Sequence, residues 1–166
     1  SLDESKQAAL RTIVETLPVF FVQGPPGVGK TRLVRDLVRR RFKDDPSTRM
    51  LLSAQSNYAV DHLLHELEKV LSVEADIPPL TIRCRAKDKR DEAGKFDVGV
   101  QARKIAEDFA KSKLVGGVDE ELRRRASLLA KSYEVSAANE EAPDRFNQRA
   151  FEGLVLRSAN AVFATT

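Results

Sequence analysis

The sequence predicts an α/β protein with a parallel sheet, and two patterns support that prediction. Short continuous apolar runs, bounded by turn residues, alternate with longer stretches in which apolar residues recur every three or four positions. Strands that are separated by helices pair in parallel, because the chain must cross over before it can form the next strand. A chain of 166 residues buries roughly two thirds of its unfolded surface, which is enough for one globular domain.

The first half of the chain alternates between helix and strand. The run at 19–22 reads VFFV between Pro18 and Gly24, which is typical of a strand that is buried on both faces. The helix that begins near residue 57 carries a leucine-rich stripe at helical spacing. We therefore expect helices over 3–16, 31–42 and 57–71, and strands over 19–22, 50–54 and 80–84.

From residue 85 onward the sequence becomes more charged and mainly helical. The polar stretch 85–95 reads as a loop, and we expect three helices followed by a final strand, over 100–113, 120–133, 144–157 and 161–164. This pattern predicts a first core part at 1–84, a helical insertion at 85–158 and a returning core strand at 159–166.

Composition limits the possible classes of protein. Lys and Arg total 28 against 25 Asp and Glu, and a net charge of +3 is too small to indicate nucleic-acid binding by itself. No apolar run has the ~18 residues of a membrane span. Cys84 is the single cysteine, which excludes an internal disulfide and favours an intracellular site, cytoplasmic or nuclear. Because the chain opens with Ser1 and has its only methionine at Met50, we expect it to be part of a longer protein.

The segment GPPGVGKT at 24–31 is the most informative motif. It matches G-x-x-x-x-G-K-[ST] and lies between a predicted strand and a predicted amphipathic helix. Its glycines let successive backbone N–H groups point into one concavity, and the following helix adds its positive end. We expect Lys30 to reach the β and γ phosphates and the Thr31 hydroxyl to ligate Mg²⁺. The predicted nucleoside-triphosphate site comprises Gly24, Pro25, Pro26, Gly27, Val28, Gly29, Lys30 and Thr31.

Three other segments, together with this loop, carry a family resemblance. They are LDESKQAAL at 2–10, LLSAQSNYAVDHLL at 51–64 and SANAVFATT at 158–166. The chain resembles superfamily 1 helicases, specifically the branch of the nonsense-mediated-decay RNA helicase and senataxin. In that branch the loop reads GPPGTGKT, Gln7 matches the adenine-recognising glutamine, and the second segment is similar to motif Ia with Gln55 replacing a proline. The last segment is similar to motif Ic, and Thr165 falls on its nucleic-acid-contacting threonine.

The resemblance implies an incomplete RecA-like P-loop NTPase fold with a helical insertion. It also implies an ATP-dependent helicase or translocase on single-stranded DNA or RNA, with ATP and Mg²⁺ as cofactors. The nucleic-acid contacts would come from Gln55, Ser56, Asn57 and Thr165. The family's acidic motif and its second RecA-like domain are not among these 166 residues, so we expect this segment to bind ATP without useful hydrolysis. The rest of the helicase chain, including that second domain, would be its partner.

Two other function classes stay open at this point. One is a small P-loop kinase or NTPase acting on a metabolite, and the other is a non-hydrolysing nucleotide-binding interaction module. Single residues also have purely structural interpretations: Ser56 or Asn57 as a helix N-cap, Gln7 as a solvated surface residue, and Thr165 as a strand end. His62 and His65 lack the further ligands that a metal site needs. The choice between DNA and RNA is not decided by the sequence.

Overall fold

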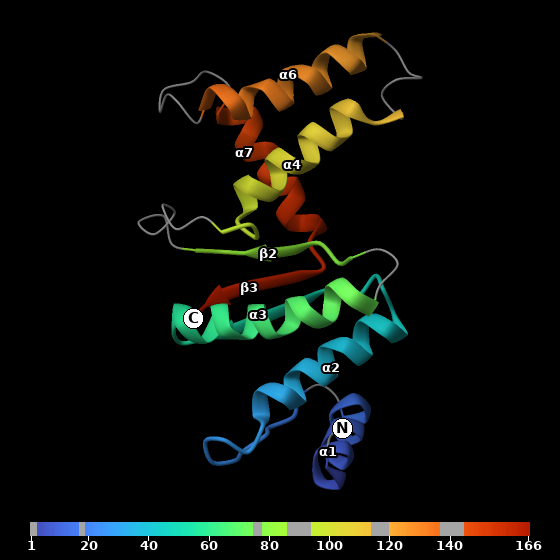
Figure 1. Cartoon of the computed structure of the whole chain (residues 1–166), viewed down its shortest axis with the longest axis vertical. Coiled ribbons are helices and arrows are strands. Elements are labelled where there is room, and N and C mark those ends of the chain that lie inside the picture. The colour runs from blue at the N-terminus through green and yellow to red at the C-terminus, as the bar shows by residue number, and fades with distance from the viewer. Residues whose placement is uncertain (1–2, 17–18, 75–77, 86–93, 114–119, 137–144) are drawn as a thin grey trace. The chain divides into compact units, whose positions relative to one another are not determined.

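The computed structural model describes residues 3–16, 19–74, 78–85, 94–113, 120–136 and 145–166 (Figure 1). The chain divides into two compact units, which we treat separately. The first unit comprises Ser1–Thr48 and Ser56–Pro79, and the second comprises Arg49–Gln55 and Leu80–Thr166.

The first unit begins with helix α1, which spans Glu4–Glu15. The Asp3 side chain caps it by accepting a hydrogen bond from the Lys6 backbone N–H at 3.0 Å. At the other end the Thr16 N–H donates to the Thr12 carbonyl at 2.8 Å. No residue of α1 is buried, although its sequence is amphipathic.

Helices α2 (Lys30–Asp44) and α3 (Asn57–Glu74) pack against each other in the first unit. Both match the predicted helices and extend a few residues beyond them. The buried side chains recur at helical spacing, as the sequence pattern predicts: Leu33, Val38 and Phe42 from α2, and Val60, Leu64, Leu67 and Leu71 from α3. At the surface, Arg35 of α2 lies 3.7 Å from the carboxylate of Glu66 on α3.

The strand predicted at 19–22 is wrong for this structure. These residues are described, and they have no regular secondary structure. All four side chains are exposed, and Phe21 is 90% exposed. An apolar run becomes a strand only when a neighbour completes its backbone hydrogen bonds. The sheet formed by the described residues does not include this run. No described strand therefore supplies the backbone hydrogen bonds that residues 19–22 would need to form a strand.

The second unit contains a parallel sheet with strand order β1-β3-β2. Strand β1 spans Met50–Ala54, β2 spans Thr81–Arg83 and β3 spans Ala161–Thr165. Met50 and Thr81 both pair with Ala161, so the last strand in sequence is central. Asn160 aligns the outer strands, because its carbonyl accepts from Met50 N–H at 2.8 Å and its side-chain oxygen accepts from Leu80 N–H at 3.0 Å. The predicted parallel pairing is confirmed.

Three helices surround the core of the second unit: α4 (Val98–Lys111), α6 (Glu120–Ser136) and α7 (Arg145–Ser158). They lie together in Figure 1, and each contacts the other two. Their buried cluster combines small and large residues from the helices, from β2 and from the residue that follows α7, namely Ile82, Ala102, Ala106, Tyr133, Val155 and Ala159. The alanines allow close helix packing, and the buried Gln148 amide is satisfied by donating to the Ser132 carbonyl at 2.7 Å.

Candidate functional site

The loop before α2 has the backbone shape that the glycine pattern predicts. Gly27 and Gly29 have φ angles of 81° and 85°, in the left-handed region that side chains with a Cβ rarely adopt. Gly29 is the N-cap of α2, and the helix begins at Lys30 without a side-chain cap. The first N–H groups of a helix have no intrahelical partner, and α2 has no acidic residue in its first turn to neutralise them.

The Lys30 side chain folds back over this loop. Its ammonium donates to the carbonyl oxygens of Gly24 at 2.6 Å and Pro25 at 2.8 Å. Thr31 follows in the first turn and is exposed. A positive helix end, two left-handed glycines and one lysine ammonium together suit a polyphosphate, which is anionic and needs close backbone approach.

A magnesium ion fits this loop only as a companion of bound phosphate. The Thr31 hydroxyl offers one oxygen ligand, and Mg²⁺ requires six in octahedral arrangement. Within the described ranges, no group of three or more His, Cys, Asp or Glu side chains is placed to hold a metal. Phosphate and water oxygens would therefore supply most of the coordination.

Helix α1 borders the loop, a contact that the sequence does not reveal. A Cβ placed on Gly29 would lie 3.2 Å from Cε of Lys6, so that lysine stem covers the last glycine of the loop. The Lys6 ammonium is ion-paired with Asp3. The side-chain bond from Lys6, together with its backbone N–H, holds the pKa of Asp3 well below its usual range. A cation on α1 therefore lies beside the start of α2.

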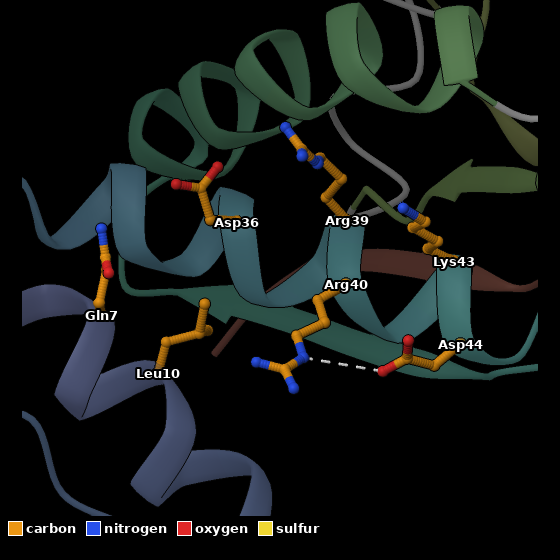
Figure 2. A pocket seen from close by; sticks show the side chains of 7 residues that line it. All are labelled: Gln7, Leu10, Asp36, Arg39, Arg40, Lys43 and Asp44. Atoms are coloured by element: carbon orange, nitrogen blue, oxygen red, sulfur yellow. Dashed lines mark ion pairs between the residues drawn. The ribbon is translucent and has the colours of Figure 1, made fainter. Parts of the chain in front are cut away.

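Gln7, the next residue of α1, lines a pocket of about 440 Å³ with residues of α2 (Figure 2). In Figure 2 its amide points toward α2, on which Arg40 lies 3.8 Å from the Asp44 carboxylate. The other lining residues are mostly charged: Leu10, Asp36, Arg39, Arg40, Lys43 and Asp44. Sequence reasoning singled out Gln7 and did not place these residues around it. The run of basic residues between Arg32 and Lys43 is the sequence signal that could have indicated them.

The candidate nucleic-acid residues fall into two groups. In the second unit, Ala54 pairs with Thr165, and the Thr166 N–H donates to the Ala54 carbonyl at 3.1 Å. Gln55 and Thr165 are both exposed at the carboxyl ends of adjacent parallel strands, where α/β folds commonly bind ligands. In the first unit, Ser56 caps α3, because its hydroxyl accepts from the Ala59 N–H at 3.2 Å. Asn57, which is half-buried, is the first residue of that helix.

Two other singled-out residues have structural surroundings. Cys84 is half-buried beside the core cluster of the second unit, and desolvation raises the pKa of its thiol. His62 stacks against Tyr58, with ring centroids 6.5 Å apart. Neither the cysteine nor His62 belongs to a metal-ligand group within the part of the chain that the structure describes.

Comparison with known proteins identifies the family. A family described as an AAA domain matches residues 1–165. The chain belongs to this family. A curated protein from Methanocaldococcus jannaschii, named an uncharacterized ATP-dependent helicase, is 33% identical over 69 residues. That stretch is 42% of this chain and 10% of the helicase. The chain is thus an AAA domain that carries a P-loop at residues 24–31. No helix among its described residues is both long and apolar enough to span a membrane.

Proposed function

We propose that this chain is the ATP-binding N-terminal part of the first motor domain of an ATP-dependent helicase or translocase. It would move along single-stranded nucleic acid. The observation that carries the proposal is the placement of the Lys30 ammonium against the Gly24 and Pro25 carbonyls at the start of α2. The left-handed glycines beside it complete a cradle for phosphate. The name of the M. jannaschii relative supports the helicase assignment.

The branch that contains the nonsense-mediated-decay RNA helicase and senataxin is our finer proposal. Four sequence motifs support it, and they include the loop at 24–31 and the SNYAVDHLL segment. The SNYAVDHLL segment also disfavours the alternative that the chain is a metabolite kinase. The contact of Lys6 with Gly29 supports an adenine role for Gln7, since it places α1 beside the phosphate loop. The division at residues 84 and 158 into core, helical insertion and returning strand is part of the same proposal.

Each group in the loop has a distinct task in this mechanism. Backbone N–H groups of the loop and of the α2 start would hold the phosphates of ATP. Lys30 would exchange its two carbonyl partners for phosphate oxygens, because an ammonium binds an anionic oxygen more strongly than a neutral carbonyl oxygen. Thr31 would be the chain's own ligand to Mg²⁺, which when bound neutralises phosphate charge. Gln55, Ser56, Asn57 and Thr165 would contact the strand.

Lys30→Ala tests the nucleotide site. We expect the affinity of the 166-residue chain for a fluorescent ATP analogue to fall about 10-fold or more, since a charge-assisted bond contributes roughly 1.5–3 kcal/mol. Lys104→Ala is the matched control, because Lys104 is an exposed lysine of α4 in the other unit. An unchanged affinity in Lys30→Ala, or equal losses in both variants, would contradict the assignment.

Hydrolysis provides a separate test of the same proposal. We expect no steady ATP turnover by this chain alone, with or without poly(U) or poly(dT). The acidic motif and the second RecA-like domain, which would stabilise the transition state in the family that the chain resembles, are not among these 166 residues. Sustained turnover that disappears in Lys30→Ala would show that the chain carries a complete catalytic site.

A further inference from the structure

We propose that Tyr58 and His62 form an aromatic platform on which a base of single-stranded nucleic acid stacks. This inference rests on the proposed function and adds a base contact to it. Tyr58 is the second residue of α3 and is 82% exposed. His62 follows one turn later and is also exposed. The two rings are stacked, with an interplanar angle of 30°.

Packing within the first unit does not explain why an aromatic side chain stands at position 58, because Tyr58 is not part of the buried core. The buried stripe of α3 includes Val60, Leu64 and Leu67, which occupy a different face of the helix from the two rings. Residues four apart share one helix face, so Tyr58 and His62 together present a continuous aromatic surface to solvent. Their centroid distance lies in the range of offset-stacked aromatic pairs, and such a pair holds the tyrosine ring in place.

The surroundings favour a nucleic acid over an apolar protein surface. Among the α3 residues whose side chains are described, Tyr58 is the only large apolar one that is exposed. A protein-docking patch would need a broader apolar area than one ring supplies. A base, in contrast, needs only a ring face, and stacking on aromatic side chains is tolerant of sequence.

The charge at the start of α3 agrees with that occupant. The first turn of α3 contains no acidic residue, so the positive end of the helix is not neutralised locally. The nearest carboxylate on the helix is the half-buried Asp61, in the turn after Tyr58. A phosphate beside the Ser56 cap and a base on the Tyr58 ring would then belong to adjacent parts of one nucleotide.

Tyrosine fluorescence tests the platform directly. The chain has no tryptophan and two tyrosines, and the other, Tyr133, is only 8% exposed in the second unit. In a Tyr133→Phe background, titration with oligo(dT) or oligo(U) should quench the emission of Tyr58 as the oligonucleotide binds. Tyr58→Ala should weaken binding about 10-fold, while Tyr58→Phe should keep near-normal affinity, because the ring face is what the base contacts.

An abasic oligonucleotide of the same length separates stacking from phosphate binding. The difference between the unsubstituted chain and Tyr58→Ala should disappear with this ligand, which retains the phosphates and lacks bases. Equal oligo(dT) affinity of the two proteins, or a Tyr58 signal that does not change on binding, overturns the platform and leaves the proposed function standing. If the unsubstituted chain binds the ATP analogue but no oligonucleotide, the nucleic-acid part of the proposed function fails, and the platform fails with it.

Discussion

The phosphate-loop region of the first unit and the core cluster of the second unit use their residues in opposite ways. In the first unit, the residues around the phosphate loop are exposed, two glycines hold left-handed backbone, and α1 buries nothing. In the second unit, Ala102, Ala106 and Ile82 are at most 1% exposed and join in one cluster that spans helices and sheet. The phosphate-loop region therefore holds groups suited to bind an anion, and the core cluster of the second unit holds well-packed apolar structure.

This contrast indicates where a substitution should affect binding and where it should affect stability. Open loops with free N–H groups suit an anion, and the same openness leaves little apolar burial to stabilise them. Close-packed clusters tolerate few changes of volume. The following substitutions test the separation, in order of the size of the expected effect.

Ile82→Ala should have the largest effect, and on stability alone. Ile82 is fully buried in the cluster of the second unit, so truncation leaves a cavity and costs about 2–5 kcal/mol of unfolding free energy. Denaturant titration followed by circular dichroism measures the loss. Affinity of the folded variant for ATP should stay within about twofold, as expected when the substitution and the nucleotide site belong to separate compact units. A large loss of affinity in folded protein would remove the contrast between the units.

Gly29→Ala should have an intermediate effect on both properties. An alanine at a φ of 85° lowers the free energy of unfolding by roughly 1–2 kcal/mol. Its methyl group would also lie 3.2 Å from Cε of Lys6 and would push that side chain away. We expect lower unfolding free energy and weaker ATP binding. Gly153→Ala is the matched control, because that glycine lies within α7 with nothing within 4 Å of an added Cβ. Gly153→Ala should instead raise the free energy of unfolding by about 0.5–1 kcal/mol. If both substitutions changed the stability in the same direction, the loop geometry would be contradicted.

Cys84 should show the smallest effect, in its pH-dependent reactivity. Burial raises the pKa of its thiol, and the nearby positive charge of Arg83 offsets this only in part. A raised pKa leaves less thiolate at a given pH, so alkylation near pH 8 should be slower than for free cysteine and should accelerate at higher pH. The denatured chain is the control and should react like free cysteine. Equal alkylation rates in the folded and denatured chain would show that the second unit does not shield the Cys84 thiol from solvent.

Local patterns gave most of the secondary structure and the phosphate loop. Strand β1 has the predicted bounds, and α3 buries the predicted stripe. Helix α4 starts two residues earlier than predicted, because the Asp97 side chain caps it by accepting from the Gly99 N–H at 2.8 Å. These features depend on neighbours in sequence, so sequence reasoning can reach them.

Features that depend on distant partners could not be predicted in the same way. The apolar run at 19–22 looks like a strand, and only the sheet reveals that nothing described pairs with it. The contact of Lys6 with Gly29 joins two elements whose approach no periodicity encodes. Tyr58 falls within a familiar motif, and only its exposure and its stacking on His62 set it apart.

The central place of β3 has a consequence for how the chain reaches its native state. Among the described residues, β3 is the strand neighbour of both β1 and β2, apart from a single bridge between Arg83 and Asp97. Neither outer strand therefore has a described strand partner until residues 161–165 have been synthesised. Loop closure over so many residues gives the sheet a high contact order, and its assembly should follow helix formation. On the ribosome, β1 would therefore remain without a strand partner while the four described helices α3, α4, α6 and α7 are synthesised. Pulse-labelled hydrogen exchange should show the amides of β1 gaining protection after those of α4.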